Sequence, residues 1–432
     1  MHAFRFIVAA ALAAALPANA DLRTELDTLA KQVEPRVIEW RRDIHQHPEL
    51  GNREFRTAGI VAEHLQSLGL EVRTGVAHTG VVGLLRGGKP GPVVALRADM
   101  DALPVTEEVD LPFASKVKTT WAGQETGVMH ACGHDTHVAM LMGVAEILSK
   151  KRADLRGSVK FIFQPAEESP PPGEAGGAAL MIEEGALENP RPDAIFALHV
   201  GSRLNVGQIA YRPGPMMASG DVLHITVRGK QTHGAAPWAG VDPIVVASQI
   251  VLGLQTIVSR GLEITREPAI VSIGTIQGGN RFNIIPDTVE MSGTIRTFDE
   301  DMRKDIHRRI RQIAESIAES AGATAEVRID EAYAVTVNDP VLTERMVPTL
   351  RRVGGDDNVF VANKVTGAED FSYFQRIVPG MYFFLGITPK GQDPRKVAFN
   401  HSPRFYVDES GLLLGVRALS QLALDYMELN AK

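Results

Sequence analysis

The stretch PVVALRADMDALP, residues 92–104, indicates the fold class. Its first half, residues 92–98, is a nearly continuous apolar run, which is typical of a strand covered on both faces of a sheet. Two acids, Asp99 and Asp101, follow this run. Open α/β sheets place their functional sites at the carboxyl ends of strands. The stretch therefore predicts a buried strand that delivers carboxylates to a site.

Two further apolar runs have the same arrangement. Residues 159–163 precede Glu167 and Glu168, and residues 194–198 precede His199. Segments with the three- and four-residue apolar spacing of helices lie between the runs. This alternation predicts a doubly wound α/β domain with a mixed sheet, in which the acids and the histidine share one edge. The alternative for each acid is an ordinary cap or turn residue.

A second domain is expected after the Pro- and Gly-rich segment 211–220. Residues 221–329 have the order β-α-β-β-α-β, which is typical of a ferredoxin-like α+β sandwich. The α/β pattern then resumes and ends in an amphipathic helix at 410–430. We therefore expect the first domain at 21–214 and 333–432, with an insert at 215–332.

Composition excludes some partners. The chain has 432 residues, 44% hydrophobic and 22% charged, with a formal net charge of −7. No basic stripe with interleaved aromatic residues occurs, so we expect no nucleic-acid partner.

The N-terminus is predicted to be a secretory signal. Arg5 is followed by a short apolar run at 7–16 and by Ala18-Asn19-Ala20, a small-x-small cleavage site. The run is too short to span a bilayer, so no stable membrane anchor is expected. We expect removal of residues 1–20 and export to the periplasm or the medium.

The stretch HACGHDTH, residues 130–137, holds the only cysteine of the chain. A thiolate and an imidazole two residues apart are ligands typical of zinc and related metals. The alternative is a buried, inert cysteine at a helix start. Export favours an occupied thiol, because an oxidising compartment normally pairs cysteines. The candidate metal ligands are Cys132, His134, Glu168, His199 and His401.

Five candidate ligands exceed the four of a closed structural zinc site and suit two ions that share ligands. Such a pair can polarise a carbonyl and activate a water molecule. In the adjacent acids, Glu168 would bind metal while Glu167 serves as a general base, since neighbouring carboxylates near cations divide their pKa values.

Several motifs resemble those of the metal-dependent aminoacylase/carboxypeptidase family, a zinc peptidase family. They include ADMDALP (98–104), HACGHD (130–135), QPAEE (164–168), HGAAP (233–237), NIIPD (283–287), GAEDF (367–371) and NHSP (400–403). They are spread over nearly the whole chain. The branch that it resembles holds hippurate hydrolases, N-acyl-amino-acid amidohydrolases and auxin-conjugate hydrolases.

The resemblance implies a dinuclear catalytic domain and an inserted lid that also forms a homodimer or a higher oligomer. It implies the same five metal ligands, with Glu167 as the base and Asp101 as the acid that orients a ligand. His233 would polarise the scissile carbonyl from the partner subunit, and Asn283 and Arg296 would hold the substrate carboxylate.

One position departs from the wider family, which has a ligand histidine where this chain has Asp99. The cysteine branch shares this change, so Asp99 is not expected to bind metal. His130 and His137 match no ligand position and are expected either to support the ligands from behind or to be structural.

The expected reaction is metal-dependent hydrolysis of the amide bond of an N-acyl amino acid. Zinc is the expected metal, and such sites also accept manganese, cobalt or nickel. One alternative is a dipeptidase or carboxypeptidase. Another is a periplasmic binding protein that holds an acylated amino acid without cleaving it.

Overall fold

The computed structural model describes residues 16–431, which form two compact units. The first unit contains the described residues up to Ala210, together with Arg345–Phe360 and the chain from Tyr382 onward. The second unit contains Tyr211–Glu344 and Val361–Met381. The insert expected at 215–332 lies within the second unit, which also takes in residues on both sides of it.

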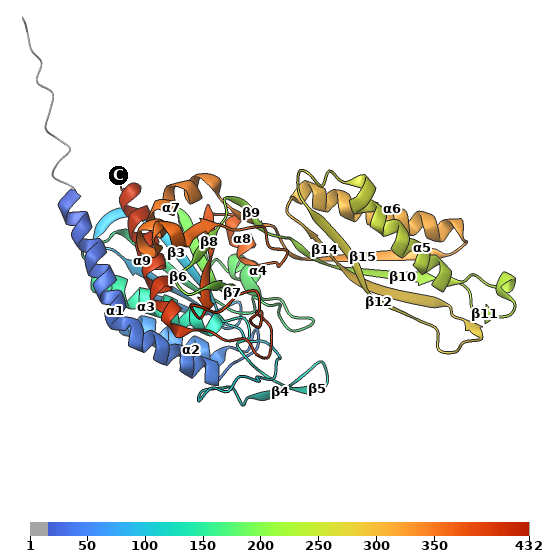
Figure 1. The fold of residues 1–432 in the computed structure, drawn as a ribbon, viewed down its shortest axis with the longest axis horizontal. Helices are drawn as coiled ribbons and strands as arrows, with labels where there is room; N and C mark the ends of the chain where they lie inside the picture. The colour runs from blue at the N-terminus through green and yellow to red at the C-terminus, as the bar shows by residue number, and fades with distance from the viewer. Residues whose placement is uncertain (1–15, 432) are drawn as a thin grey trace, which may run out of the picture. The chain divides into compact units, whose positions relative to one another are not determined.

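The first unit is built on a mixed sheet of eight strands in the order β1-β2-β6-β3-β7-β18-β8-β17 (Figure 1). The strands are β1 (Glu71–Val76), β2 (Gly80–Arg86), β3 (Lys89–Asp99), β6 (Arg156–Gln164), β7 (Ala194–Asn205), β8 (Ile209–Tyr211), β17 (Val359–Val361) and β18 (Gly380–Thr388). A separate hairpin, β4 (Lys118–Trp121) and β5 (Gln124–Gly127), was not expected from the sequence.

The three apolar runs form adjacent parallel strands at the centre of this sheet. β3 lies between β6 and β7, with Leu96 opposite Phe161 on one side and Phe196 on the other. All three side chains are fully buried. The predicted shared edge is therefore confirmed for these strands. β7 continues to Asn205, so His199 lies within the strand and not at its end.

Helices α3 and α9 pack on β3 and β7, and α1 packs outside both of them (Figure 1). Every residue of α3 from His134 to Leu148 is buried by this arrangement. The helices associated with this unit are α1 (Leu16–Gln46), α2 (Phe55–Ser67), α3 (His134–Lys150), α4 (Gly177–Glu183), α7 (Pro340–Gly354) and α9 (Leu412–Leu429). The predicted signal segment lies largely outside the described residues.

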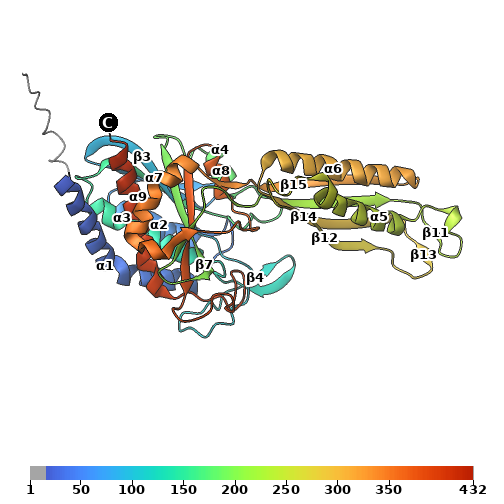
Figure 2. The same ribbon diagram turned by 45° about the horizontal axis from the view of Figure 1, so that its top comes forward.

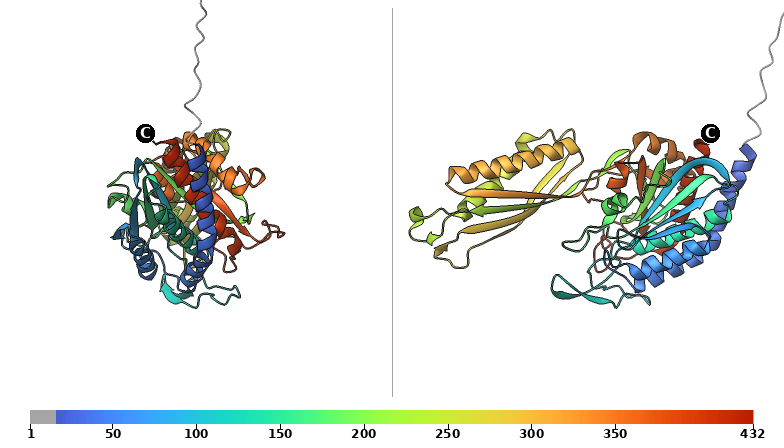
Figure 3. Two further views of the ribbon diagram at one scale, coloured as in Figure 1. Left: turned by 90° about the vertical axis from the view of Figure 1, so that its left-hand side faces the viewer. Right: turned by 180° about the vertical axis from the view of Figure 1, so that it is seen from behind.

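The second unit confirms the predicted β-α-β-β-α-β insert. Its antiparallel sheet has the order β12-β14-β10-β15, and α5 and α6 lie together on one face (Figures 2 and 3). The elements are β10 (Gly220–Arg228), α5 (Pro243–Thr256), β12 (Ala269–Gly278), β14 (Thr288–Thr297), α6 (Glu300–Ser320) and β15 (Thr324–Tyr333). Shorter elements are β9 (Gly214–Met217), β11 (Thr232–His233), β13 (Ile284–Ile285), β16 (Thr336–Asn338) and α8 (Phe371–Gln375).

One described segment, Pro243–Gly261, is long and apolar enough to cross a membrane by length and composition alone. It consists of α5 and the turn that follows it. Val246, Ile250 and Leu254 on this helix are buried in the core between the helices and the sheet. This packing places one face of the helix in the core of the unit, while 28% of the segment is buried.

Candidate metal centre

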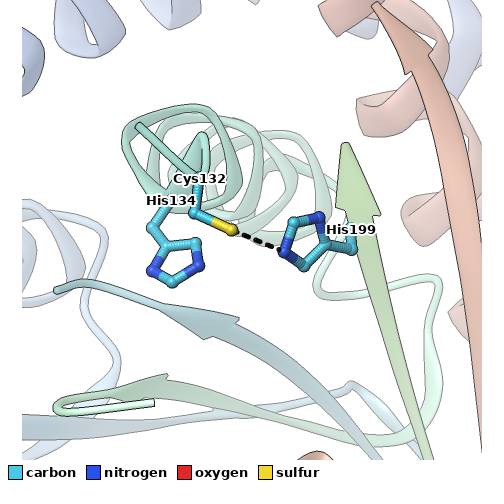
Figure 4. Close-up of side chains that lie close together, drawn as sticks. All are labelled: Cys132, His134 and His199. Carbon is cyan, nitrogen blue, oxygen red and sulfur yellow. Dashed lines mark hydrogen bonds between the residues drawn. The ribbon is translucent and has the colours of Figure 1, made fainter. Parts of the chain in front are cut away.

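Gly133 determines how the cysteine and the first histidine are presented. It has a φ of 93° and caps α3, so Cys132 lies in the loop before the helix and His134 in its first turn. A Cβ at Gly133 would lie 2.4 Å from Cγ2 of Val200. Both the left-handed backbone and this close approach require glycine. Figure 4 shows Cys132, His134 and His199 gathered in one place.

The Cys132 thiol lies between two histidines. Its Sγ is 3.3 Å from Nε2 of His199 and 3.3 Å from Nε2 of His401. His401 Nε2 is in turn 2.7 Å from Oε1 of Glu168. The structure thus brings together all five residues that the sequence suggested as ligands.

These residues form two groups that could each hold a metal ion. One group is Cys132, His134 and His199, and the other is Cys132, Glu168 and His401. Within each group the ligand atoms lie within 4.8 Å of one another. Cys132 is common to both groups, which is the arrangement needed for a ligand shared by two ions.

Asp101 orients His134 and the Glu168 backbone. The Nδ1 of His134 lies 2.9 Å from the carbonyl oxygen of Asp101 and 3.2 Å from its Oδ1. Oδ2 of Asp101 accepts the backbone N–H of Glu168 at 2.9 Å. With its hydrogen on Nδ1, the His134 ring directs the lone pair of Nε2 toward the cluster. A carboxylate that holds a ligand histidine in this way is common around metals.

The charges at the cluster favour a cation. Nε2 of His134 is buried without a hydrogen-bond partner among the described residues. Burial lowers the pKa of His134, but Asp99, Asp101 and Glu168 outweigh this effect and raise it to about 10. Burial and the two glutamates also raise the pKa of the Cys132 thiol well above its usual value. A divalent cation would replace these protons, so the donor set fits a metal.

Glu167 lies beside this cluster and is 5% exposed. Its Oε2 is 3.9 Å from Nε2 of His134. The position suits a base that acts on a water molecule held at the cluster.

The hydrogen bonds of Asp99 go to residues outside the two ligand groups, and Nδ1 of His134 lies 3.8 Å from its Oδ1. Its carboxylate accepts from Arg97 Nη1 and pairs with Nδ1 of His137, each at 2.5 Å. Burial opposes ionisation, yet His134, Arg97 and His137 hold the pKa of Asp99 well below its usual value. Nε2 of His137 accepts the backbone N–H of Val200 at 2.9 Å. His137 therefore links Asp99 to the strand that carries His199.

His130 lies apart from the ligand groups. Neither ring nitrogen has a hydrogen-bond partner among the described residues, and burial lowers its pKa to about 3. The ring lies near His45, with 6.4 Å between the ring centroids.

Sequence reasoning missed Asn400. Its Nδ2 donates to the carbonyl oxygens of Cys132 at 3.2 Å and Val200 at 3.1 Å. The next residue, His401, has a φ of 73°, and its N–H donates to the carbonyl of Ala131. Asn400 thereby fastens the turn that carries one ligand to the loop that carries another. The NHSP motif contained this signal.

The three candidate residues of the second unit occupy two places. His233 on β11 is exposed and lies beside Asn283, since β11 pairs with β13. Arg296 lies near the far end of β14, over Gly220, where a Cβ would be 2.5 Å from its Nη1. The two places lie on different sheets, since β11 and β13 pair only with each other and β14 belongs to the four-stranded sheet.

A match between most of the chain and a protein-family model identifies the family. The model of peptidase family M20/M25/M40 matches residues 95–425. The chain belongs to this family. The predicted resemblance is thus confirmed, and the protein is a metallo-amidohydrolase or metallopeptidase family enzyme.

Individual members of the family are similar to this chain in sequence over nearly its full length. Thermostable carboxypeptidase 2 of Saccharolobus solfataricus is 44% identical, covering 94% of this chain and 99% of the relative. N-acetylcysteine deacetylase of Bacillus subtilis is 38% identical, covering 92% and 98%. The crystal structure of Bacillus subtilis YXEP, described as a dinuclear metal-binding peptidase of the M20 family, is 36% identical with a TM-score of 0.77, covering 92% and 99%.

Proposed function

We propose that this enzyme hydrolyses the amide bond of N-acyl amino acids and releases a carboxylic acid and an amino acid. The observation that carries the proposal is the buried Glu167 beside two ligand groups that share Cys132. The similarity to an N-acetylcysteine deacetylase supports this substrate class.

We propose that the site holds two divalent ions, with zinc favoured and manganese, cobalt or nickel also accepted. One would be held by Cys132, His134 and His199, and the other by Cys132, Glu168 and His401. The dinuclear description of the 36% identical YXEP structure supports this number. Bound ions would polarise the amide carbonyl and make water acidic enough to attack near neutral pH.

The residues of the chain perform the remaining steps. The Glu167 carboxylate takes a proton from the attacking water and delivers it to the nitrogen of the leaving amine, so that one group serves as base and then acid. Asp101 keeps His134 in the tautomer that binds through Nε2. Burial of Glu167 and His134 limits competition from bulk water.

The residues of the second unit would bind the substrate. Nδ1 of His233 accepts the N–H of Ala235 at 2.9 Å, so the hydrogen of the neutral ring sits on Nε2 and can be donated to a developing oxyanion. The guanidinium of Arg296 can hold a carboxylate through two hydrogen bonds. The Oδ1 of Asn283 is buried without a partner among the described residues, and as an acceptor it suits the amide N–H of the substrate and not the carboxylate.

We propose a homodimer through the second unit. β12 is an edge strand, with Ile270 38% and Ile276 54% exposed, and Leu252 on α5 is 71% exposed. An apolar edge strand invites pairing with another copy. Dimerisation would let His233 of one copy serve the site of its partner.

We also propose that the enzyme is exported and acts in the periplasm or the medium. This proposal rests on the sequence of residues 5–20, and a mature protein that begins at Asp21 would support it.

A dipeptidase or carboxypeptidase is the second candidate, and the 44% identical carboxypeptidase favours it. A hydrolysis screen over acetyl-, benzoyl- and indoleacetyl-amino acids and dipeptides, with and without a chelator, separates the candidates. We expect chelator-sensitive release of amino acid from an N-acyl substrate. Turnover of dipeptides alone would favour the second candidate, and binding without turnover would favour a binding protein.

A further inference from the structure

The turn that presents Glu167 has a strained backbone. Ala166, the residue before the base, has a φ of 50°, and Ser169 has a φ of 92°. Residues other than glycine rarely adopt this left-handed conformation and keep it only where the surroundings hold it. Ala166 is 1% exposed, so the groups that hold it belong to the protein.

Glu54 makes the contact that holds this turn. Its Oε1 accepts the N–H of Ala166 at 2.9 Å, and its Oε2 lies 2.5 Å from the hydroxyl of Thr79. Glu54 is fully buried, although it is neither a candidate metal ligand nor in contact with one in the described residues. Burying a carboxyl group costs free energy, which the hydrogen bonds to Ala166 and Thr79 offset. A buried carboxyl group that does not bind metal therefore points to a structural role in this turn.

The residues beside Glu54 support the same turn through packing. A Cβ at Gly51 would lie 3.1 Å from both Cα and Cβ of Ala166 and 3.3 Å from the carbonyl oxygen of Ser169. Nδ2 of the buried Asn52 donates to Ala175 and Glu174 at the far end of the same loop. The segment 51–54 therefore forms a fixed support behind the loop 166–175.

We propose that Glu54 is a positioning residue for the general base: through its hydrogen bond to the Ala166 N–H, it holds the strained turn that aims the Glu167 carboxylate at the metal centre. The proposal rests on the proposed role of Glu167. It assigns no proton transfer to Glu54 itself.

The hydrogen bonds of Glu54 determine which substitutions test its role. Burial and the nearby Asp101 raise the pKa of Glu54 to about 8, which favours its neutral form. Glutamine keeps the acceptor for the Ala166 N–H, although its NH2 group would make the Thr79 hydroxyl, which donates to Glu54 Oε2, the acceptor instead. Glu54→Gln should therefore keep the support, whereas Glu54→Ala removes it.

Steady-state kinetics, metal analysis and amide hydrogen exchange test the proposal on the full chain. In Glu54→Ala we expect kcat to fall about 10- to 100-fold, the range for a misplaced catalytic group. KM should stay within about threefold and the metal content should not change. The peptide that contains Ala166 should exchange faster. In Glu54→Gln, kcat and exchange should both return close to wild type.

Gly51→Ala provides a second variant that changes no charge. Its added methyl group would lie 3.1 Å from Cα and Cβ of Ala166 in the same turn. This substitution should also lower kcat, which keeps the test valid if Glu54→Ala does not fold. Gly59→Ala on α2, where a Cβ meets nothing within 4 Å, is the matched control. Glu146→Ala is the control for loss of a buried glutamate, since Glu146 lies 12 residues along α3 from His134.

Several results would overturn the proposal. One is a folded Glu54→Ala variant with the kcat of wild type, and another is loss of metal from that variant. A third is a Glu54→Gln variant whose kcat is as low as that of Glu54→Ala. Unchanged exchange at Ala166 in Glu54→Ala would also overturn it. Because exchange needs no substrate, failure of the proposed reaction and failure of this positioning role give different results.

Discussion

The candidate residues of the two units are arranged in opposite ways. In the first unit, residues as distant in sequence as Cys132 and His401 come within 3.3 Å, because loops from several elements meet at one edge of the sheet. In the second unit, His233 lies in the small β11–β13 pair, whereas Arg296 lies near the end of β14 in the four-stranded sheet. The first unit thus contains a concentrated site, and the second offers separated, accessible groups.

This difference indicates a division of labour. Buried, mutually constrained groups with shifted pKa values suit chemistry on a bond. Separated groups on a distinct unit suit substrate binding in the proposed dimer, where His233 of one copy would serve the site of its partner. Changes at the concentrated site of the first unit should therefore abolish turnover, while changes in the second unit should leave the metal centre intact.

Glu167→Gln tests the concentrated site and has the largest expected effect on rate. It removes the base but keeps the size of the side chain, so kcat should fall by about 10²- to 10⁴-fold. Metal content should match wild type when both are measured by elemental analysis. Glu183→Gln, on the exposed side of α4, is the control and should be fully active. Wild-type turnover in Glu167→Gln would remove Glu167 from the mechanism.

His233→Ala tests the exposed end of the second unit. Loss of an oxyanion donor should lower kcat about 10²- to 10³-fold. The Tm and the metal content should not change, because the His233 side chain is exposed. His224→Ala on β10 of the same unit should have no such effect. An unchanged kcat in His233→Ala would show that His233 takes no part in the chemical step.

Arg296→Ala tests the other end of β14. Loss of a charge-assisted pair with the substrate carboxylate should raise KM about 10- to 100-fold with little change in kcat. An N-acyl amino acid amide, which lacks the carboxylate, should show a much smaller difference between wild type and variant. Equal losses on both substrates would contradict the assignment. Arg228→Ala, an exposed arginine on the same sheet, is the control.

A further prediction concerns stability rather than turnover and is a pH-dependent difference at Glu54. Its pKa rises from 4.5 to about 8 on folding, so its contribution is fully present below pH 4.5 and is lost as pH rises through 8. The Tm of wild type should therefore fall relative to that of Glu54→Gln between pH 5 and pH 8. Each kcal/mol of change in the free energy of unfolding should shift Tm by about 2–4 °C or less. A pH-independent difference would contradict the raised pKa.

The sequence predicted the concentrated site because local patterns determine it. Three apolar runs, each followed by acids or a histidine, could only place those groups together if the strands were parallel neighbours, and β6, β3 and β7 are. The β-α-β-β-α-β insert was also predicted, because each strand and helix has its own periodicity. Strand order did not place His401, which was a candidate as a ligand-type residue in a turn and matched a ligand position in the resemblance.

The supporting residues could not be predicted in the same way. Glu54, Asn400 and the Asp99–His137 pair act through contacts between segments far apart in the sequence, and no local periodicity marks such contacts. Strained positions such as Ala166 and His401 are also hidden, because both are residues that normally avoid a positive φ. Tertiary packing alone explains them.

Metal stoichiometry in wild type and Cys132→Ser tests most directly the claim that one thiolate serves two ligand groups. Elemental analysis of the purified, folded proteins should give two divalent ions per chain in wild type. Cys132→Ser should lose both ions, or one ion together with most of the affinity for the other, and should show no detectable amide hydrolysis. A wild-type protein without stoichiometric metal, or a variant that keeps both ions and full activity, would contradict the account.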